Sequence, residues 1–314
     1  MIRLDDIQQE FRGTIAIDEP MARHVTFRIG GNADIYLAPI DRDDAVRLFG
    51  MLEDAGTEWT IIGNGSNILV ADEGIRGLVV NLEKGFHHLR VEKGEIVAGA
   101  GVKLAQLVNF AIINGYGGAE MLAGIPGTLG GAVIMNAGAY GGEISDYMTW
   151  IDIITKGEYR RITPEEAGFG YRRSDLVGSI VLEAGFRFPT GESVPLKKAR
   201  RDLLVKRNAA QPVNWPNAGS IFKNPEGDYA ARLIEACGLK GERIGGAEIS
   251  ELHANFIINV EKATAADVIA LVEQIRAAVL EKFDVLLELE IKPLGFDAGT
   301  LQRVGLSESK GVRA

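Results

Sequence analysis

A serine, a lysine and an asparagine suited to catalysis or anion binding lie together in residues 217–225, which read Asn-Ala-Gly-Ser-Ile-Phe-Lys-Asn-Pro. Ser220 follows a glycine, so its hydroxyl could be exposed on a tight backbone, and Lys223 and Asn224 could bind an anion. The segment lacks the Gly-x-Ser-x-Gly pattern of a nucleophile elbow, which argues against serine-hydrolase chemistry. An isolated serine is more often structural, so this segment alone leaves the role of Ser220 open.

Two further segments contribute charged side chains. Arg172 and Arg173 are adjacent in a mostly acidic chain, which suggests recognition of a carboxylate or phosphate, because guanidinium groups donate paired hydrogen bonds. A solvated surface pair is an equal alternative. Near the C-terminus, Glu288, Glu290 and Lys292 alternate with apolar residues and would share one face of a strand. An exposed polar face is the simpler explanation, and Glu290 is a candidate catalytic acid only if that face lines a pocket.

Two glycine-rich segments could bring the backbone close to a ligand. Residues 124–143 are rich in glycine, alanine and small apolar residues, whereas flexible linkers are polar and serine-rich. We therefore expect this run to lie against a flat or phosphorylated cofactor. Residues 63–67 read Gly-Asn-Gly-Ser-Asn, and their backbone N–H groups could form an anion-binding nest that fits a pyrophosphate, with Ser66 and Asn67 as further donors. An ordinary hairpin turn is the alternative, and neither the Rossmann fingerprint nor a P-loop is present.

The composition excludes several classes of function. The 314 residues carry a formal net charge of -9, whereas non-specific nucleic-acid binding needs a basic face. Cys237 is the one cysteine, no Cys/His cluster has the spacing of a zinc site, and we expect the histidines to be structural, with no metal. The N-terminus lacks the apolar stretch of a signal peptide, and no apolar run reaches the ~20 residues of a membrane span. We expect a cytoplasmic protein.

Hydrophobic periodicity predicts the elements that hold these segments in place. Apolar residues at helical spacing predict helices at residues 41–56, 102–115, 228–238 and 264–283. Asp43 or Asp44 is expected to cap the first of these helices, and Thr264 the last. Short runs rich in Val and Ile predict strands at residues 33–37, 59–62, 78–81, 95–98, 150–154, 180–188, 255–260 and 285–291. Strands outnumber helices up to about residue 190, which indicates an α+β fold with mixed sheets.

The composition changes again in the second half of the chain. Residues 185–203 are basic and contain Pro189 and Pro195, so we expect a domain boundary near residues 190–205. Residues 296–314 lack periodic apolar positions, and we expect a loosely ordered tail there.

Taken in order along the chain, these segments resemble one family, the UDP-N-acetylenolpyruvoylglucosamine reductases, which are flavoenzymes of peptidoglycan precursor synthesis. The resemblance covers about residues 24–295, nearly the whole chain. It rests on residues 26–31 (Thr-Phe-Arg-Ile-Gly-Gly), 63–67, 124–141, 171–172 (Tyr-Arg), 217–225 and 288–292. Each segment is weak by itself, whereas the full ordered set is specific.

The resemblance implies a fold and a cofactor. It implies an FAD-binding domain of the p-cresol-methylhydroxylase type at residues 1–200, with α+β subdomains at about 20–82 and 83–200, and a C-terminal α+β substrate-binding domain at residues 201–295. Residues 63–67 would hold the FAD pyrophosphate, and the glycine-rich run would wrap the cofactor from the other side. The cofactor-binding residues implied are Ile62, Gly63, Asn64, Gly65, Ser66, Asn67, Ile125, Pro126, Gly130, Gly131, Ile134 and Ala139.

The family's catalytic trio maps onto Arg172, Ser220 and Glu290, with Arg172 preferred over Arg173 because it directly follows Tyr171. NADPH would reduce the flavin and leave, and hydride would then pass from flavin N5 to the vinyl carbon of an enolpyruvyl ether. Arg172 and a protonated Glu290 would stabilise the charge that develops on the substrate carboxylate, and Ser220 would protonate the adjacent carbon. The further substrate contacts implied are Tyr171, Lys223 and Asn224.

The chain resembles the shorter branch of the family, because the spacing between residues 171–172 and 217–225 leaves little room for the substrate-covering loop of the longer branch. We expect a monomer that acts on UDP-N-acetylglucosamine enolpyruvate with NADPH and forms UDP-N-acetylmuramate. Two alternatives stay open: another FAD-dependent oxidoreductase of the same fold, and a non-catalytic nucleotide-sugar-binding protein.

Overall fold

The N-terminal part of the chain is built around two sheets. The computed structural model describes residues 2–306. The first sheet has the order β1 (Thr14–Pro20), β2 (Asn32–Ala38), β5 (Ile75–Asn81), β3 (Trp59–Ile62); β1 and β2 are antiparallel, and the other pairs are parallel. The short 3-10 helix η1 (Met21–Arg23) links β1 to β2, and α1 (Leu4–Glu10) and α2 (Arg42–Asp54) bury apolar residues in the same core as this sheet. The first sheet therefore mixes parallel and antiparallel pairs, as expected.

The second sheet is antiparallel throughout. Its order is β11 (Glu158–Ile162), β10 (Met148–Thr155), β12 (Ile180–Phe186), β7 (Glu95–Gly99), β6 (Leu89–Glu92). Every residue of β12 is buried, which fits its place in the middle of the sheet. The smaller elements that accompany this sheet are α3 (Leu104–Ile113), η2 (Ala119–Leu122), α4 (Leu129–Ile134), β8 (Gly138–Ala139), β9 (Gly142–Glu143) and η3 (Ile144–Tyr147).

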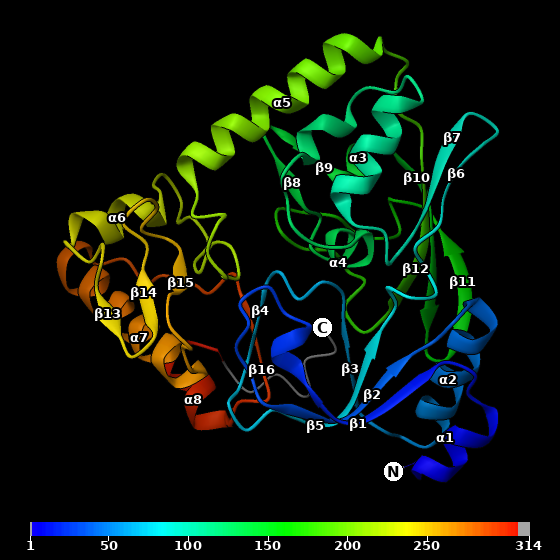
Figure 1. Cartoon of the computed structure of the whole chain (residues 1–314), viewed down its shortest axis with the longest axis horizontal. Helices are drawn as coiled ribbons and strands as arrows, with labels where there is room; N and C mark the ends of the chain where they lie inside the picture. Colours follow the sequence, from blue (N-terminus) through cyan, green and yellow to red (C-terminus); the bar gives the residue numbers. More distant parts are fainter. Residues whose placement is uncertain (1, 307–314) are drawn as a thin grey trace.

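The C-terminal part forms a smaller α+β unit on the opposite side of the molecule (Figure 1). Its sheet has the order β13 (Arg243–Ile244), β14 (Ala247–Ile249), β15 (Ile257–Asn259), and its helices are α6 (Ala230–Ala236), α7 (Ala265–Phe283) and α8 (Ala298–Arg303). A last strand, β16 (Lys292–Leu294), crosses back and pairs in parallel with β4 (Ile68–Val70). This parallel pair joins the C-terminal segment to the turn at residues 63–67.

The two parts share a hydrophobic core as well as a strand pair. Phe27, Ile29 and Leu69 come from the N-terminal half, and all three pack in the core cluster that contains Phe222 and the buried face of α7. Phe27 has no exposed surface. The burial of N-terminal side chains in this core ties the C-terminal unit firmly to the rest of the chain.

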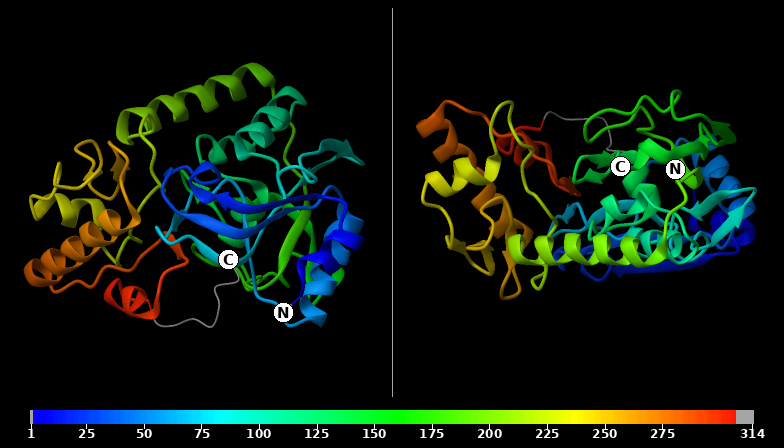
Figure 2. Two further views of the ribbon diagram at one scale, coloured as in Figure 1. Left: turned by 60° about the horizontal axis from the view of Figure 1, so that its bottom comes forward. Right: turned by 90° about the horizontal axis from the view of Figure 1, so that it is seen from above.

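A long helix, α5 (Ser193–Ala210), connects the strand-rich part to the C-terminal unit in the chain and packs against α3 and η2. In the left view of Figure 2 it runs along the top edge of the molecule beside α3, and only one of its ends approaches the yellow C-terminal elements. Residues 190–205 were expected to contain a boundary, and the predicted break at residues 200–201 falls inside this helix. No residue of 193–210 is fully buried. Leu196 and Leu204 pack against the main core but stay partly exposed, and the basic residues between them masked this apolar side of the helix in the sequence.

Most of the other predicted elements are confirmed within one to three residues. The helices α2, α3, α6 and α7 occupy the expected places, and Thr264 caps α7 in a capping box with Asp267. The cap of α2 was wrongly predicted: the Asp41 side chain accepts a hydrogen bond from the Asp44 backbone N–H. Of the helices in residues 2–306, none is both long enough and apolar enough to cross a membrane.

Two predictions near the C-terminus are wrong. The strand expected at residues 285–291 is absent, and the regular strand β16 begins only at Lys292. Leu289 forms an isolated bridge with Phe222, so the alternation of buried and exposed residues persists without a continuous ladder. The expected loose tail contains α8, and Val304 behind it is fully buried. Residues 307–314 of that tail lie outside the described residues.

Candidate active site

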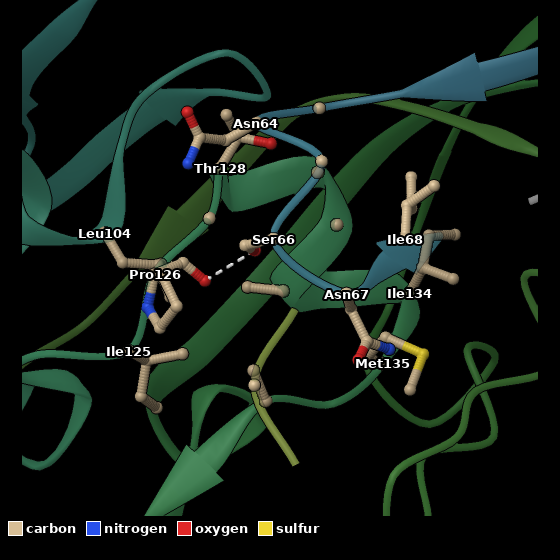
Figure 3. Close-up of a pocket in the computed structure, with 18 of the residues that line it drawn as sticks. Asn64, Ser66, Asn67, Ile68, Leu104, Ile125, Pro126, Thr128, Ile134 and Met135 are labelled. Atoms are coloured by element: carbon tan, nitrogen blue, oxygen red, sulfur yellow. Dashed lines mark hydrogen bonds between the residues drawn. The ribbon is translucent and has the colours of Figure 1, made fainter. Parts of the chain in front are cut away.

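A cavity of about 400 Å³ lies between the turn at residues 63–67, the glycine-rich run and the C-terminal unit (Figure 3). All twelve residues expected to bind the cofactor line it. Arg172, Ser220 and Glu290 line the same cavity although they lie far apart in the chain. Among residues 2–306, no group of three His, Cys, Asp or Glu side chains could hold a metal ion. The cavity therefore combines exposed backbone with three reactive side chains.

The turn at residues 63–67 joins the end of β3 to the start of β4. Gly65 has φ +58°, and a Cβ there would meet the backbone of Val25 at 2.6 Å. A Cβ at Gly63 would lie 2.1 Å from the Thr128 hydroxyl oxygen. Gly65 is required for its positive φ. At both positions a side chain would also collide with a neighbouring segment.

Two side-chain donors of this turn, Ser66 and Asn67, are bonded to protein. The Ser66 hydroxyl donates a hydrogen bond of 2.9 Å to the Pro126 carbonyl, which joins the turn to the glycine-rich run (Figure 3). The Asn67 amide donates a hydrogen bond of 3.0 Å to the Glu290 carbonyl. The turn thus contacts both walls of the cavity through Ser66 and Asn67, and its backbone and the Asn64 side chain are the groups suited to an anion.

The glycine-rich run begins irregularly, is helical in its middle and ends in the short antiparallel pair of β8 and β9. Gly124 and Gly127 have φ of +79° and +131°, whereas α4 occupies residues 129–134. A Cβ at Gly131 would meet no atom closer than the Thr128 hydroxyl oxygen at 4.0 Å, so the space beside it belongs to the cavity. The run was expected to present backbone to a ligand, and Gly131 does so from a helix.

Arg172 and Glu290 face each other across the cavity. Arg172 Nε lies 3.7 Å from Glu290 Oε1, and each side chain is less than a quarter exposed. Arg172 is held in place by a left-handed backbone with φ +55° and by a 2.7 Å hydrogen bond from Nη2 to the Gly138 carbonyl. Burial raises the pKa of Glu290, and this effect exceeds the opposing attraction of Arg172 and Lys223. The site therefore shifts the Glu290 carboxyl toward its neutral form beside a fixed cation.

Ser220 lies on a loop whose backbone is held by hydrogen bonds to Asn255. Gly219 before it has φ +80°. Asn255 is buried and accepts hydrogen bonds from the backbone N–H groups of Ile221 and Phe222, at its carbonyl and its side-chain oxygen. The Ile221 carbonyl in turn accepts a 2.8 Å hydrogen bond from the Glu290 backbone N–H. The serine and the glutamate are therefore held by directly bonded segments.

The three further substrate contacts implied by the resemblance lie outside the lining that the described residues form. Tyr171 is 62% exposed. Lys223 forms an ion pair of 3.3 Å with Glu288, and the Asn224 side-chain oxygen accepts the N–H of Ala230 at the start of α6. Their roles toward substrate stay predictions.

Sequence reasoning missed two polar residues at the C-terminal end of α5. Arg207 and Gln211 both line the cavity, and the Arg207 Nε and Gln211 Oε1 atoms are buried without a hydrogen-bond partner among the described residues. Burial lowers the pKa of Arg207. A Cβ at Gly124 would lie 2.6 Å from Arg207 Cδ, so this glycine makes room for the arginine. Their spacing of four residues in a helix was the available signal.

Comparisons with known proteins agree with this geometry. Residues 33–163 match the family described as FAD binding domain, and residues 211–294 match the C-terminal domain of UDP-N-acetylenolpyruvoylglucosamine reductase. The UDP-N-acetylenolpyruvoylglucosamine reductase of Desulforamulus reducens is 44% identical over 295 residues, covering 93% of this chain and 97% of that protein. That of Heliobacterium modesticaldum is 42% identical over 310 residues, covering 98% and 99%. The chain belongs to the UDP-N-acetylenolpyruvoylglucosamine reductase family.

A solved structure of the family has the same fold. The UDP-N-acetylenolpyruvylglucosamine reductase of Thermus caldophilus matches with a TM-score of 0.78 at 35% identity, covering 90% of this chain and 99% of that chain. The expected fold class is confirmed: the chain is α+β, with an FAD-binding domain followed by the C-terminal domain of the reductase family.

Proposed function

We propose that this chain uses FAD and NADPH to reduce the enolpyruvyl ether of UDP-N-acetylglucosamine enolpyruvate to UDP-N-acetylmuramate. The observation that carries the proposal is the meeting of Arg172, Ser220 and Glu290 in the cavity that the cofactor-binding segments also line. A nucleotide-binding protein without catalysis has no need of a neutral acid, a fixed cation and a hydroxyl in one cavity. The family to which the chain belongs supports the same activity.

The residues of the cavity fit FAD. The open space beside Gly131 accepts a flat group, and the backbone of residues 63–67 offers N–H groups to a pyrophosphate. The unpartnered Arg207 Nε and Gln211 Oε1 supply one donor and one acceptor, which the edge of a flavin ring can satisfy. Bound FAD would supply hydride transfer, and NADPH would be the source of that hydride.

The side chains would then act on the enolpyruvyl group. Arg172 and a protonated Glu290 would donate hydrogen bonds to the substrate carboxylate, where negative charge develops, and each donor of this kind contributes roughly 3–4 kcal/mol to the transition state. Ser220 would transfer its hydroxyl proton to the carbon next to the one that receives hydride. The raised pKa of Glu290 supports its role as a donor, because an ionised carboxylate would repel the substrate.

Absorbance of the purified protein tests the proposal in two steps. The protein should be yellow as purified or after adding FAD, and anaerobic NADPH should bleach it. Adding UDP-N-acetylglucosamine enolpyruvate should then restore the flavin absorbance with formation of UDP-N-acetylmuramate. A protein that never takes up FAD would contradict both flavoenzyme hypotheses. Bleaching without recovery on adding the sugar nucleotide would leave another FAD-dependent oxidoreductase as the better assignment.

A further inference from the structure

The turn at residues 63–67 is bonded directly to the segment that carries Glu290. The Asn67 amide donates to the Glu290 carbonyl at 3.0 Å, and the Asn67 carbonyl accepts the Lys292 backbone N–H at 2.8 Å. The second bond belongs to the first residue pair of the short parallel ladder of β4 and β16, and the Asn67 side chain adds a bond just before it. In Figure 3 the Asn67 side chain points away from the Ser66 hydroxyl, toward Met135. The amide of a residue expected to bind cofactor thus bonds to the segment that carries Glu290.

The same turn is bonded to the loop that carries Ser220. The Thr26 backbone N–H donates to the Gly65 carbonyl at 3.3 Å, and the Thr26 hydroxyl donates to the Asn217 carbonyl at 2.7 Å. The Asn217 side-chain oxygen accepts the Gly219 N–H at 2.9 Å, one residue before Ser220. Thr26 opens a sequence motif, residues 26–31, to which the proposed chemistry assigns no role.

The geometry points to Asn67 and Thr26 as positioning residues that set Glu290 and the Ser220 loop relative to the cofactor turn. The Glu290 peptide is held on both sides, by Ile221 through its N–H and by Asn67 through its carbonyl. Neither Asn67 nor Thr26 takes part in proton or hydride transfer. Their effect arises because a displacement of about 1 Å in a reacting group can slow a reaction by roughly 100-fold. The inference rests on the proposed reductase function.

Two variants remove the positioning hydrogen bonds, and the second of them keeps the shape of the side chain. Asn67→Ala removes the donor to the Glu290 carbonyl, and Thr26→Val removes the donor to the Asn217 carbonyl. Asn114→Ala is the matched control, because its amide also donates to a backbone carbonyl, that of Phe110 at 2.8 Å, at the exposed end of α3. Each protein is tested as the FAD-loaded full chain.

We expect Asn67→Ala and Thr26→Val to bind FAD and to be bleached by NADPH as the unchanged protein is. The return of flavin absorbance on adding the sugar nucleotide should slow by roughly 10- to 100-fold at saturating substrate. The variants should therefore lower kcat and change KM less. Asn67→Ala should also move the titration midpoint of the Glu290 carboxyl, measured by isotope-edited NMR and assigned with Glu290→Gln. Thr26→Val should leave that midpoint in place, because its bond leads to the Ser220 loop. Asn114→Ala should match the unchanged protein in every measurement.

Three results would overturn the inference. One is weaker FAD binding by Asn67→Ala with normal recovery at saturating FAD, since the amide would then be a cofactor ligand. Another is recovery at the normal rate in both variants, and the third is an equal slowing in Asn114→Ala, which would indicate general destabilisation. If the unchanged protein is bleached but does not recover with the sugar nucleotide, the proposed function fails. The Glu290 titration then still decides whether Asn67 positions that residue.

Discussion

Replacing Glu290 tests whether a neutral carboxyl is what the site requires. Glu290 Oε1 lies 3.7 Å from Arg172 Nε. At this distance two opposite charges attract by about 4 kcal/mol at an effective dielectric constant of 20. An ionised Glu290 would therefore offset much of the attraction between Arg172 and a substrate carboxylate. Because burial raises the pKa of Glu290, the neutral form persists to higher pH and leaves the arginine free to bind.

Glutamine and alanine at this position separate the donor from the charge. Glu290→Gln keeps an N–H donor of similar shape and should slow flavin recovery by roughly tenfold at most, about the value of one ordinary hydrogen bond. Glu290→Ala removes the donor and should slow recovery by about 100- to 1000-fold. The unchanged enzyme should lose this half-reaction as pH rises through the raised pKa of Glu290, and the glutamine variant should lack that limb.

Stopped-flow absorbance after anaerobic bleaching measures these rates across a pH series. Denaturant unfolding gives an independent check of the direction of the Glu290 pKa shift. A carboxyl whose folded pKa is raised contributes stability that is full below its unfolded pKa and is lost as pH rises through the folded value. Glu290→Gln should therefore gain stability relative to the unchanged protein at high pH. Recovery as slow as that of Glu290→Ala, or a rate that rises with pH through this range, would refute the neutral-donor role.

Three other predictions concern proton transfer, the cofactor space and the shared core. Ser220→Ala should be bleached normally by NADPH but lose about 100- to 10,000-fold in flavin recovery, and equal losses in both half-reactions would contradict the proton-donor role. Gly131→Val should fill the space beside α4, so the protein should keep its circular-dichroism melting curve but bind no FAD in fluorescence titrations; a yellow variant would show that this space is not the cofactor's. Phe27→Ala should lower the free energy of unfolding by about 3–5 kcal/mol in urea titrations. Ile17→Ala, at a residue 64% exposed, should change it little, and similar losses in both variants would refute the burial argument.

The elements predicted well are those that bury a regular apolar stripe. The stripe of α2, with Leu48 and Phe49, and that of α7 are buried as their spacing indicates. The apolar side of α5, with Leu196 and Leu204, is only partly buried, and the surrounding basic residues favoured a boundary over a helix in the sequence. Leu287, Leu289 and Ile291 are buried at alternate positions, yet most of this segment has no strand beside it. Periodicity reports which side chains are buried, whereas a strand also needs a partner for its backbone.

The sequence by itself determined the chemistry available to this protein. Its ordered motifs predict Arg172, Ser220 and Glu290 as the reactive trio. Glycines such as Gly65, with its positive φ, mark places where the backbone takes a conformation that other residues rarely adopt. The tertiary structure decided which groups meet. It turned the Asn67 amide toward the carbonyl of Glu290, 223 residues away, and it brought Arg207 and Gln211 to the cavity. Such contacts depend on how elements far apart in the sequence pack, and a local sequence pattern does not indicate which distant residue it will contact.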